Sequence, residues 1–412
     1  MKHLNTLVIG AGQAGLAISY YLTRAGREHL IVEKERAFKA WRDERWDSFT
    51  LVTPNWALGL PDAPYDGEDP DGFLTRQQVV EYLKGFAQRF NPPVREGIEA
   101  TAVEAAPASD ELIVRSSVGD FQAANVVVAT GTFQRPKILP FSKQLTRDVR
   151  QIHSSQYRNP DELPRGAVLV VGSGQSGVQI AEELFAHGRR VYLSTGSAGR
   201  LPRRYRGEDA ARWLERLGFF DRTVDQLPSP ADRFKPSLHV SGKDGGHTLN
   251  LHCLSRDGIT LLGHLRGGHE TQLDIAPDLK ENLVAADRAA REFKQSVDEY
   301  IQKNGLQAPE DDGPELRDGY DAPIITELDL NSTGVSTIIW ATGYSFDFSW
   351  VKFPIFDEFG YPLQKRGVTS RPGLYFLGLN WLHTIKSGLL AGVGEDAAHV
   401  ARHIESRRTE TT

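Results

Sequence analysis

Apolar and polar positions near the start of the chain follow one another in the order strand, glycine turn, helix, strand. An apolar run ends at residues 7–9, glycines punctuate residues 10–15, residues 16–25 have helical periodicity, and residues 30–33 form a second apolar run. This pattern predicts a βαβ unit.

The same pattern begins again after a proline-rich stretch in the middle of the chain. Residues 168–171 are apolar, and glycines punctuate residues 172–177. The sequence has no short-period repeat of the solenoid kind, only this duplicated unit. A chain of 412 residues suits two compact domains, so the duplication predicts one such unit in each.

The segments between and after these units are less regular. Residues 40–75 are rich in Trp, Pro and Asp and predict a long ordered loop, a kind of segment that usually carries function. Thr75 is the predicted N-cap of an amphipathic helix that runs to about Phe90. Further strands are predicted within residues 94–131, 258–265, 337–343 and 374–377, and further helices at residues 282–300 and 391–406.

Both glycine runs have the spacing G-x-G-x-x-G at a turn from strand to helix. In that setting the first glycine allows the tight turn, the second lets a pyrophosphate approach the backbone, and the third lets the helix pack on the strand. The helix N-terminus then offers N–H donors to the phosphates. Two such runs predict two bound dinucleotides.

The residue that follows the second strand indicates which dinucleotide the first unit takes. Glu33 stands 18 residues after Gly15, where a carboxylate accepts hydrogen bonds from both hydroxyls of an adenosine ribose. Because this position demands an unphosphorylated ribose, the first site is predicted to hold FAD or NAD rather than NADP.

The corresponding position of the second unit carries no acid. Ser194 and Thr195 stand there, and three arginines follow at Arg200, Arg203 and Arg204. Hydroxyl and guanidinium groups suit a 2′-phosphate, so NADP is predicted for the second site. The alternative is that the three arginines lie in a solvated loop and bind no phosphate.

Composition narrows the range of functions. Hydrophobic residues make up 40% and charged residues 25% of the chain, and the net charge of −6 offers no basic footprint for nucleic acid or an anionic membrane. We see neither a membrane-spanning apolar run nor a signal peptide, and therefore expect a cytoplasmic protein that acts on a small molecule.

Cys253 is the only cysteine, which excludes reductases that work through an intramolecular cysteine pair. The 12 histidines show no metal-ligand spacing, so no metal is predicted.

Taken together, these motifs resemble those of the class B flavoprotein monooxygenases, which include the flavin-containing and the Baeyer–Villiger monooxygenases. Besides the two glycine runs and Glu33, the matching features are the pair Trp41 and Arg42, Ala-Thr-Gly at 129–131 and Ala-Thr-Gly-Tyr at 341–344. A bacterial subgroup, some members of which are labelled flavoproteins involved in potassium transport, has similar sequences at residues 203–207, 241–246 and 392–396.

The resemblance implies an α/β fold with two Rossmann-like, glutathione-reductase-like domains, of which the FAD domain is discontinuous. It places the first part of the FAD domain at residues 1–145, an NADP domain with a helical insertion at 146–324, and the second part of the FAD domain at 325–412. The chain departs from the family at the linker signature, of which only the second half is present, beginning at His153.

The motifs and the resemblance together indicate a set of site residues. An asparagine beside the flavin in related monooxygenases implies a catalytic role for Asn55, although an asparagine after a proline is otherwise a turn residue. The linker implies that His153 organises domain contacts, and the last helix is implied to point its N-terminus at the flavin. The cofactor-binding residues indicated in this way are Gly10, Gly12, Gln13, Ala14, Gly15, Glu33, Lys34, Trp41, Arg42, Val103, Thr130, Gly131, Gly172, Gly174, Gln175, Ser176, Gly177, Ser194, Thr195, Arg200, Arg203, Arg204, Thr342, Gly343, Gly388 and Leu389.

The resemblance implies that NADPH reduces FAD, that O2 then forms a flavin hydroperoxide, and that one oxygen atom passes to a small organic substrate. That substrate would be a nitrogen or sulfur compound, a ketone or an oxo acid. One alternative is an NADPH-dependent flavin oxidase or reductase that releases H2O2 or reduces a quinone without oxygen transfer. Another is a flavin-dependent sensor in which turnover is incidental. Neither nucleic acid nor membrane is expected as a partner, and a homodimer is left open.

Overall fold

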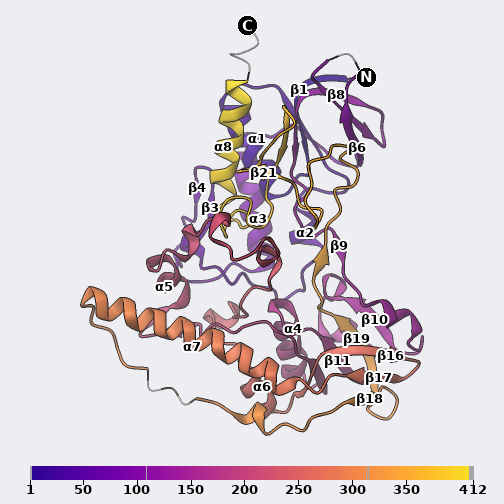
Figure 1. Ribbon diagram of the computed structural model, residues 1–412, viewed down its shortest axis with the longest axis vertical. Coiled ribbons are helices and arrows are strands. Elements are labelled where there is room, and N and C mark those ends of the chain that lie inside the picture. The colour runs from indigo at the N-terminus through magenta and orange to yellow at the C-terminus, as the bar shows by residue number, and fades with distance from the viewer. Residues whose placement is uncertain (1, 108, 312, 314, 408–412) are drawn as a thin grey trace.

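Two lobes make up the protein, and the first and last described residues lie at the far end of the first lobe (Figure 1). The computed structural model describes residues 2–107, 109–311, 313 and 315–407. Each lobe contains a largely parallel sheet with helices packed against it, which confirms the predicted α/β class with two Rossmann-like units.

The first lobe is built on a nine-stranded sheet in the order β21-β22-β23-β8-β1-β2-β5, with β7 paired to β8 and β6 to β7. Its central strands run parallel, since β1 pairs with β2 and β8, and β8 with β23. The strands are β1 (Lys2–Ile9), β2 (His29–Val32), β5 (Val94–Arg95), β6 (Ala100–Ala105), β7 (Leu112–Ser116), β8 (Phe121–Val128), β21 (Gln364–Lys365), β22 (Val368–Thr369) and β23 (Leu374–Phe376).

Helices and a small hairpin complete this lobe. Helix α1 packs against α8, which carries the end of the described chain (Figure 1). The core beneath them is formed by strand residues that are apolar on both faces, as expected of parallel strands covered by helices. The helices are α1 (Gln13–Arg24), α2 (Lys39–Arg42), α3 (Arg76–Gln88) and α8 (Val393–Ser406), and the hairpin is β3 (Gly59–Leu60) with β4 (Ala63–Pro64).

The second lobe holds a five-stranded parallel sheet in the order β10-β19-β11-β12-β15 and a separate antiparallel sheet in the order β16-β17-β18. The strands are β10 (Arg150–His153), β11 (Ala167–Val171), β12 (Val191–Ser194), β15 (Thr260–Leu262), β16 (Leu265–His269), β17 (Gln272–Ile275), β18 (Glu327–Asp329) and β19 (Val335–Trp340), with a hairpin of β13 (Arg204–Tyr205) and β14 (Glu208–Asp209). The helices are α4 (Gln175–Ala186), α5 (Ala210–Arg216), α6 (Leu251–Asp257) and α7 (Leu279–Asn304), the last of which runs from the left edge of the lobe to its middle in Figure 1.

The chain passes between the lobes twice, and the two crossings are paired. Strand β9 (Arg135–Pro136) leaves the first lobe and pairs antiparallel with β20 (Tyr344–Ser345), which returns to it.

The predicted return of the chain to the first lobe at residue 325 is therefore too early. Strands β18 and β19 belong to the second lobe, because β19 is inserted between β10 and β11, so the first lobe resumes only after Gly343. Residues 408–412 of the predicted last segment lie outside the described residues.

The predicted helices and strands agree best with the structure where the sequence contains a helix cap or a long periodic segment. Thr75 caps α3 through a reciprocal capping box with Gln78, and α3 ends at Gln88, two residues before the predicted end. The predicted strand at 258–265 is two strands instead, because Gly263 and His264 separate β15 from β16. The short helices α5 and α6 were not predicted; their seven-residue lengths give too little periodicity.

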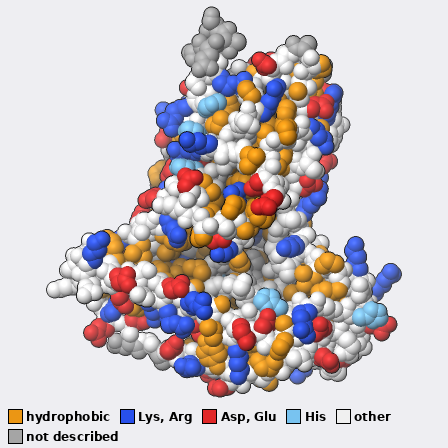
Figure 2. All heavy atoms as spheres, viewed as in Figure 1, with side chains coloured by type: hydrophobic (Ala, Val, Ile, Leu, Met, Phe, Trp, Pro, Cys, Tyr) orange, Lys and Arg blue, Asp and Glu red, His pale blue; other side chains and the backbone are white. Residues whose placement is uncertain are grey.

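The surface is hollowed where the lobes meet, and hydrophobic side chains gather around this hollow (Figure 2). None of the helices in the described part of the chain combines the length and the apolar character needed to cross a bilayer.

Candidate functional site

The first glycine turn has the backbone geometry that a dinucleotide requires. Gly10 has φ +108°, and a Cβ at that position would lie 2.7 Å from the carbonyl oxygen of Ala129. A Cβ at Gly15 would lie 1.9 Å from the carbonyl oxygen of Gly10, whereas the space around Gly12 is open to 4 Å. The three glycines therefore serve the turn, the packing of α1 and the approach of a ligand, in the way the spacing predicts.

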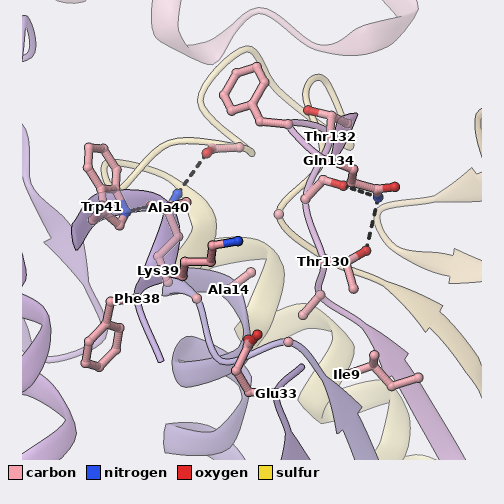
Figure 3. A pocket seen from close by; sticks show the side chains of 18 of the residues that line it. Ile9, Ala14, Glu33, Phe38, Lys39, Ala40, Trp41, Thr130, Thr132 and Gln134 are labelled. Atoms are coloured by element: carbon pink, nitrogen blue, oxygen red, sulfur yellow. Dashed lines mark hydrogen bonds between the residues drawn. The ribbon is translucent and has the colours of Figure 1, made fainter. Parts of the chain in front are cut away.

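A cavity of about 800 Å³ extends from this turn (Figure 3). Glu33 lies on its wall and is held in place, since Oε2 accepts the backbone N–H of Ala11 at 2.8 Å and Oε1 accepts that of Glu35 at 3.0 Å. The predicted residues that line the cavity are Gly10, Gly12, Gln13, Ala14, Glu33, Lys34, Trp41, Thr130, Gly131, Gly388 and Leu389.

Gln13 joins two distant parts of the cavity wall. Its Oε1 accepts the indole N–H of Trp41 at 3.2 Å, and its Nε2 donates to the carbonyl oxygen of Gly388 at 2.8 Å. The wall at Gly388 leads through Leu390 and Ala391 into helix α8, so the start of this helix lies next to the cavity. The side chain after the second glycine thus fixes the spacing between the Trp41 segment and the last helix.

Asn55 is not among the residues that line the cavity. Its side-chain Nδ2 donates to the carbonyl oxygen of Asp69 at 2.9 Å, its Oδ1 accepts the N–H of Leu74 at 3.0 Å, and only 3% of the residue is exposed. The amide therefore closes the loop of residues 55–74 from inside. The amide is thus engaged within its own loop, and the catalytic role implied for Asn55 stays a prediction.

Arg42 and Val103 also lie off the cavity wall. Arg42 donates from Nη2 to the carbonyl oxygen of Ala37 at 2.9 Å, and its Nη1 is buried with no hydrogen-bond partner among the described residues. Val103 is fully buried in β6, and its backbone N–H and C=O are bound to Trp350 and Lys352. Neither residue is among those that line the cavity.

Three cavity residues have no signature in the sequence. Lys39 contacts the carboxylates of Glu35 and Glu44; burial opposes its charge, but these contacts prevail and raise the pKa of Lys39. Arg45 lies over the ring of Trp41, with its guanidinium carbon 5.4 Å from the ring centre. Gln134 donates to Thr130 Oγ1 at 3.2 Å (Figure 3). Their position depends on how loops fold back, which no local pattern encodes.

The second glycine turn repeats the geometry of the first. Gly172 has φ +103°, and its Cβ would lie 2.7 Å from the carbonyl oxygen of Ala341. A Cβ at Gly177 would lie 1.8 Å from the carbonyl oxygen of Gly172, and the space around Gly174 is open to 4 Å. Ser176 lies in the first turn of α4, beside Gln175, whose Oε1 accepts the backbone N–H of Val240.

The hydroxyl groups predicted to meet a 2′-phosphate point elsewhere. Ser194 Oγ donates to the carbonyl oxygen of Gly263 at 2.9 Å, and Thr195 Oγ1 donates to that of Leu262 at 2.7 Å. Both residues are at most 2% exposed. They tie the end of β12 to the end of β15, so their hydroxyl protons are engaged within the sheet, and phosphate binding by these residues stays a prediction.

The three arginines predicted to bind the 2′-phosphate also form hydrogen bonds with other protein groups. Arg200 donates from Nε to Asp287 at 2.9 Å, and Asp287 also contacts His252 and Tyr320. Burial raises the pKa of Asp287, but these hydrogen bonds outweigh it and hold the pKa well below its usual range. Arg204 donates to two backbone carbonyls in the loop of residues 245–246. Arg200 is thus bound through Nε and Arg204 through both Nη atoms, while Arg204 remains exposed to solvent.

Arg203 joins the two lobes. It forms an ion pair with Asp209 of its own lobe, donates from Nη1 to the carbonyl oxygen of Val52 at 2.8 Å, and stacks on Phe73 with 4.4 Å between the guanidinium carbon and the ring centre. Its side chain is 3% exposed. The residue is thus an interlobe contact.

We expect Arg203→Ala to lower the free energy of unfolding by about 3–5 kcal/mol, because the Asp209 carboxylate, whose side chain is only 12% exposed, would lose its charged partner. Thermal unfolding of the purified variant measures this. The matched control is Arg266→Ala, which removes an exposed pair with Asp274 and should cost at most about 1 kcal/mol. Equal melting temperatures for the two variants would contradict a stabilising role of the buried Arg203 guanidinium.

The crossing between the lobes is organised around His153. Its Nδ1 accepts the N–H of Ser155 at 3.2 Å, so Nε2 is the donor to the carbonyl oxygen of Gly343 at 2.9 Å. Burial lowers the pKa of His153, which keeps the ring neutral. Next to it, Thr342 donates to the carbonyl oxygen of Lys137. Thr342 and Gly343 therefore close the paired crossing and do not line the described cavity.

Comparison with known proteins agrees with this architecture. The family described as pyridine nucleotide-disulphide oxidoreductase matches residues 7–214. An uncharacterized CzcO-like oxidoreductase of Geobacillus kaustophilus is 34% identical over 411 residues, covering 98% of this chain and 99% of the relative. A probable indole-3-pyruvate monooxygenase of Arabidopsis thaliana, YUCCA3, is 28% identical over 216 residues, covering 49% of this chain and 48% of the relative.

Among solved structures, a flavin-containing monooxygenase from Stenotrophomonas maltophilia is similar over 99% of both chains, with a TM-score of 0.67 and 19% identity. This likeness concerns the fold. With one cysteine, the chain cannot use an intramolecular cysteine pair as disulfide reductases do. The protein therefore belongs to the pyridine nucleotide-disulphide oxidoreductase family, among its members that resemble class B flavin monooxygenases.

Proposed function

We propose that the protein is an FAD- and NADPH-dependent monooxygenase that transfers one oxygen atom from O2 to a small organic substrate. One observation carries the proposal: two glycine turns with the same backbone geometry stand on two lobes that a paired crossing joins. Two dinucleotide sites in one chain suit the transfer of electrons from one bound dinucleotide to another.

The residues around the first turn fit FAD. The open approach at Gly12 admits a pyrophosphate, and the N-terminus of α1 offers it N–H donors. Glu33 is fixed where it would accept the ribose hydroxyls. The cavity of about 800 Å³ continues to the backbone at Gly388 and Leu389, which would accommodate the flavin end. When bound, FAD supplies the electron transfer and the reaction with O2.

The protein's own part is to bind, orient and exclude water. The turn at Gly172 and Gly174, followed by α4, would hold the pyrophosphate of NADPH in the same manner. Trp41, Phe38 and Trp350 give the first cavity aromatic walls, which keep bulk water from the reduced cofactor. The start of α8 beside the cavity offers a positive dipole end to negative charge.

The names of similar proteins favour oxygen transfer over simple oxidation. YUCCA3 is named as a monooxygenase of an oxo acid, and the Stenotrophomonas maltophilia protein as a flavin-containing monooxygenase. We therefore propose a nitrogen or sulfur compound, a ketone or an oxo acid as the substrate class. The competing proposal is an oxidase or reductase that passes the same electrons to O2 or a quinone.

The balance between NADPH consumed and H2O2 released separates these two proposals. In a monooxygenase each turnover consumes one NADPH and one O2, oxygenates one substrate and forms one water. We expect that at least one of a tertiary amine, a thioether, a cyclic ketone and a 2-oxo acid lowers the H2O2 formed per NADPH and yields an oxygenated product. Equal amounts of H2O2 and NADPH with every compound would favour the oxidase.

A further inference from the structure

The loop that follows β12 lies between the second glycine turn and a histidine from the neighbouring strand. The N–H of Gly196 donates to Ser173 Oγ at 2.9 Å, so the loop is tied to the middle of the G-x-G turn. A Cβ at Gly196 would lie 3.4 Å from Nε2 of His264. His264 follows β15 at the carboxyl end of the parallel sheet, the end at which such folds bind ligands.

The first lobe shows which part of a dinucleotide this place corresponds to. Glu33 follows β2 and stands 18 residues after Gly15; Thr195 follows β12 and stands 18 residues after Gly177. Thr195 cannot act as Glu33 does, because its hydroxyl donates to a strand carbonyl and is buried. The side chain facing the adenosine ribose must therefore come from a neighbouring element.

His264 is held in a defined orientation at this position. Its Nδ1 lies 2.6 Å from Oδ2 of Asp278, and its backbone N–H donates to Oδ1 of the same carboxylate at 2.9 Å. With Nδ1 bound to Asp278, Nε2 faces the Gly196 loop, and 48% of the side chain is exposed to solvent. The ring is both fixed and accessible.

We propose that His264, positioned by Asp278, contacts the 2′ substituent of the adenosine ribose and sets the preference between NADPH and NADH. The inference rests on the proposed function, because it assumes a nicotinamide dinucleotide at the second turn. A doubly protonated imidazole donates from Nε2 to a 2′-phosphate, and a neutral one accepts from a 2′-hydroxyl. One side chain can therefore meet both coenzymes, with the phosphate favoured by charge.

The test is the binding of 2′,5′-ADP and 5′-AMP to the FAD-loaded protein, measured by calorimetry without turnover. We expect His264→Gln to weaken 2′,5′-ADP about tenfold, the loss of one charge-assisted hydrogen bond, and to leave 5′-AMP nearly unchanged. His264→Arg should restore or exceed the wild-type affinity for 2′,5′-ADP. The matched control is His269→Gln, an exposed histidine at the end of β16, which should change neither affinity.

Arg204→Gln distinguishes this inference from the phosphate-binding role first expected of the arginines. Weaker 2′,5′-ADP binding in Arg204→Gln together with unchanged binding in His264→Gln would overturn the assignment to His264 while leaving an NADPH site in place. Failure of the wild-type protein to bind either nucleotide would overturn the proposed function and this inference with it.

Discussion

Gly15→Ala should yield a folded protein that no longer retains FAD. The added Cβ would lie 1.9 Å from the carbonyl oxygen of Gly10, far inside van der Waals contact. Gly10 cannot move aside easily, because it already has φ +108° and lies against the Ala129 carbonyl. The glycine turn must therefore open, and its N–H groups leave the positions that a pyrophosphate needs.

The relative size of two opposing effects decides whether Gly15→Ala stabilises or destabilises the first glycine turn. Position 15 is in helix α1, where alanine is favoured over glycine by about 1 kcal/mol. Overpacking costs about 1–3 kcal/mol when neighbours can shift, and here the obstacle is backbone. We expect the clash to prevail and to weaken FAD about 100-fold, since each ~1.4 kcal/mol is a factor of ten. Flavin absorbance relative to protein absorbance after purification measures the loss.

Gly85→Ala is the matched control for the helical part of this argument. Gly85 lies inside α3, and a Cβ there would meet nothing within 4 Å. The variant should keep its FAD and gain about 0.5–1 kcal/mol of stability. A Gly15→Ala protein as yellow as Gly85→Ala would show that the first turn does not hold FAD.

The glycine turns were predictable because their geometry is local. A third glycine five residues after the first must pack helix on strand, whatever the rest of the chain does, and the structure places Gly15 and Gly177 in this way. Glu33 was predictable for the same reason, since its place at the end of β2 follows from the length of one βαβ unit.

The arginines were not predictable, because their partners come from distant segments. Arg200 pairs with Asp287 of helix α7, and Arg203 reaches Val52 in the other lobe. Sequence spacing shows that these cations follow β12 but not which carboxylates or carbonyls meet them. The contacts of Asn55 were not predictable either, since its amide binds Asp69 and Leu74 across a loop whose path no pattern encodes.

The domain boundary was misplaced for a topological reason. Residues 335–340 are an apolar strand directly before the second Ala-Thr-Gly, and either lobe could accept such a strand. The structure inserts it between β10 and β11, where it completes the second sheet, and the return to the first lobe follows only afterwards. Strand order of this kind depends on contacts between residues far apart in sequence.

Gly177→Ala should impair the second dinucleotide site and leave the first intact. Its Cβ would lie 1.8 Å from the carbonyl oxygen of Gly172, the same clash as at Gly15 but in the other lobe. We therefore expect a protein that keeps FAD and is reduced normally by dithionite, but whose reduction by NADPH under anaerobic conditions is slower by about 100-fold, the factor that ~2.7 kcal/mol corresponds to.

Gly174→Ala should have a milder effect on the same site and serves as the comparison for Gly177→Ala. Apart from its chain neighbours, no atom of the described residues lies within 4 Å of a Cβ at Gly174, so the turn itself should survive and only the approach of a pyrophosphate should be hindered. Reduction by NADPH should then recover at high NADPH concentration in Gly174→Ala but not in Gly177→Ala, where the turn is lost. Normal NADPH reduction in both variants would mean that the electrons enter elsewhere, and the second turn would have to be reassigned to a structural role.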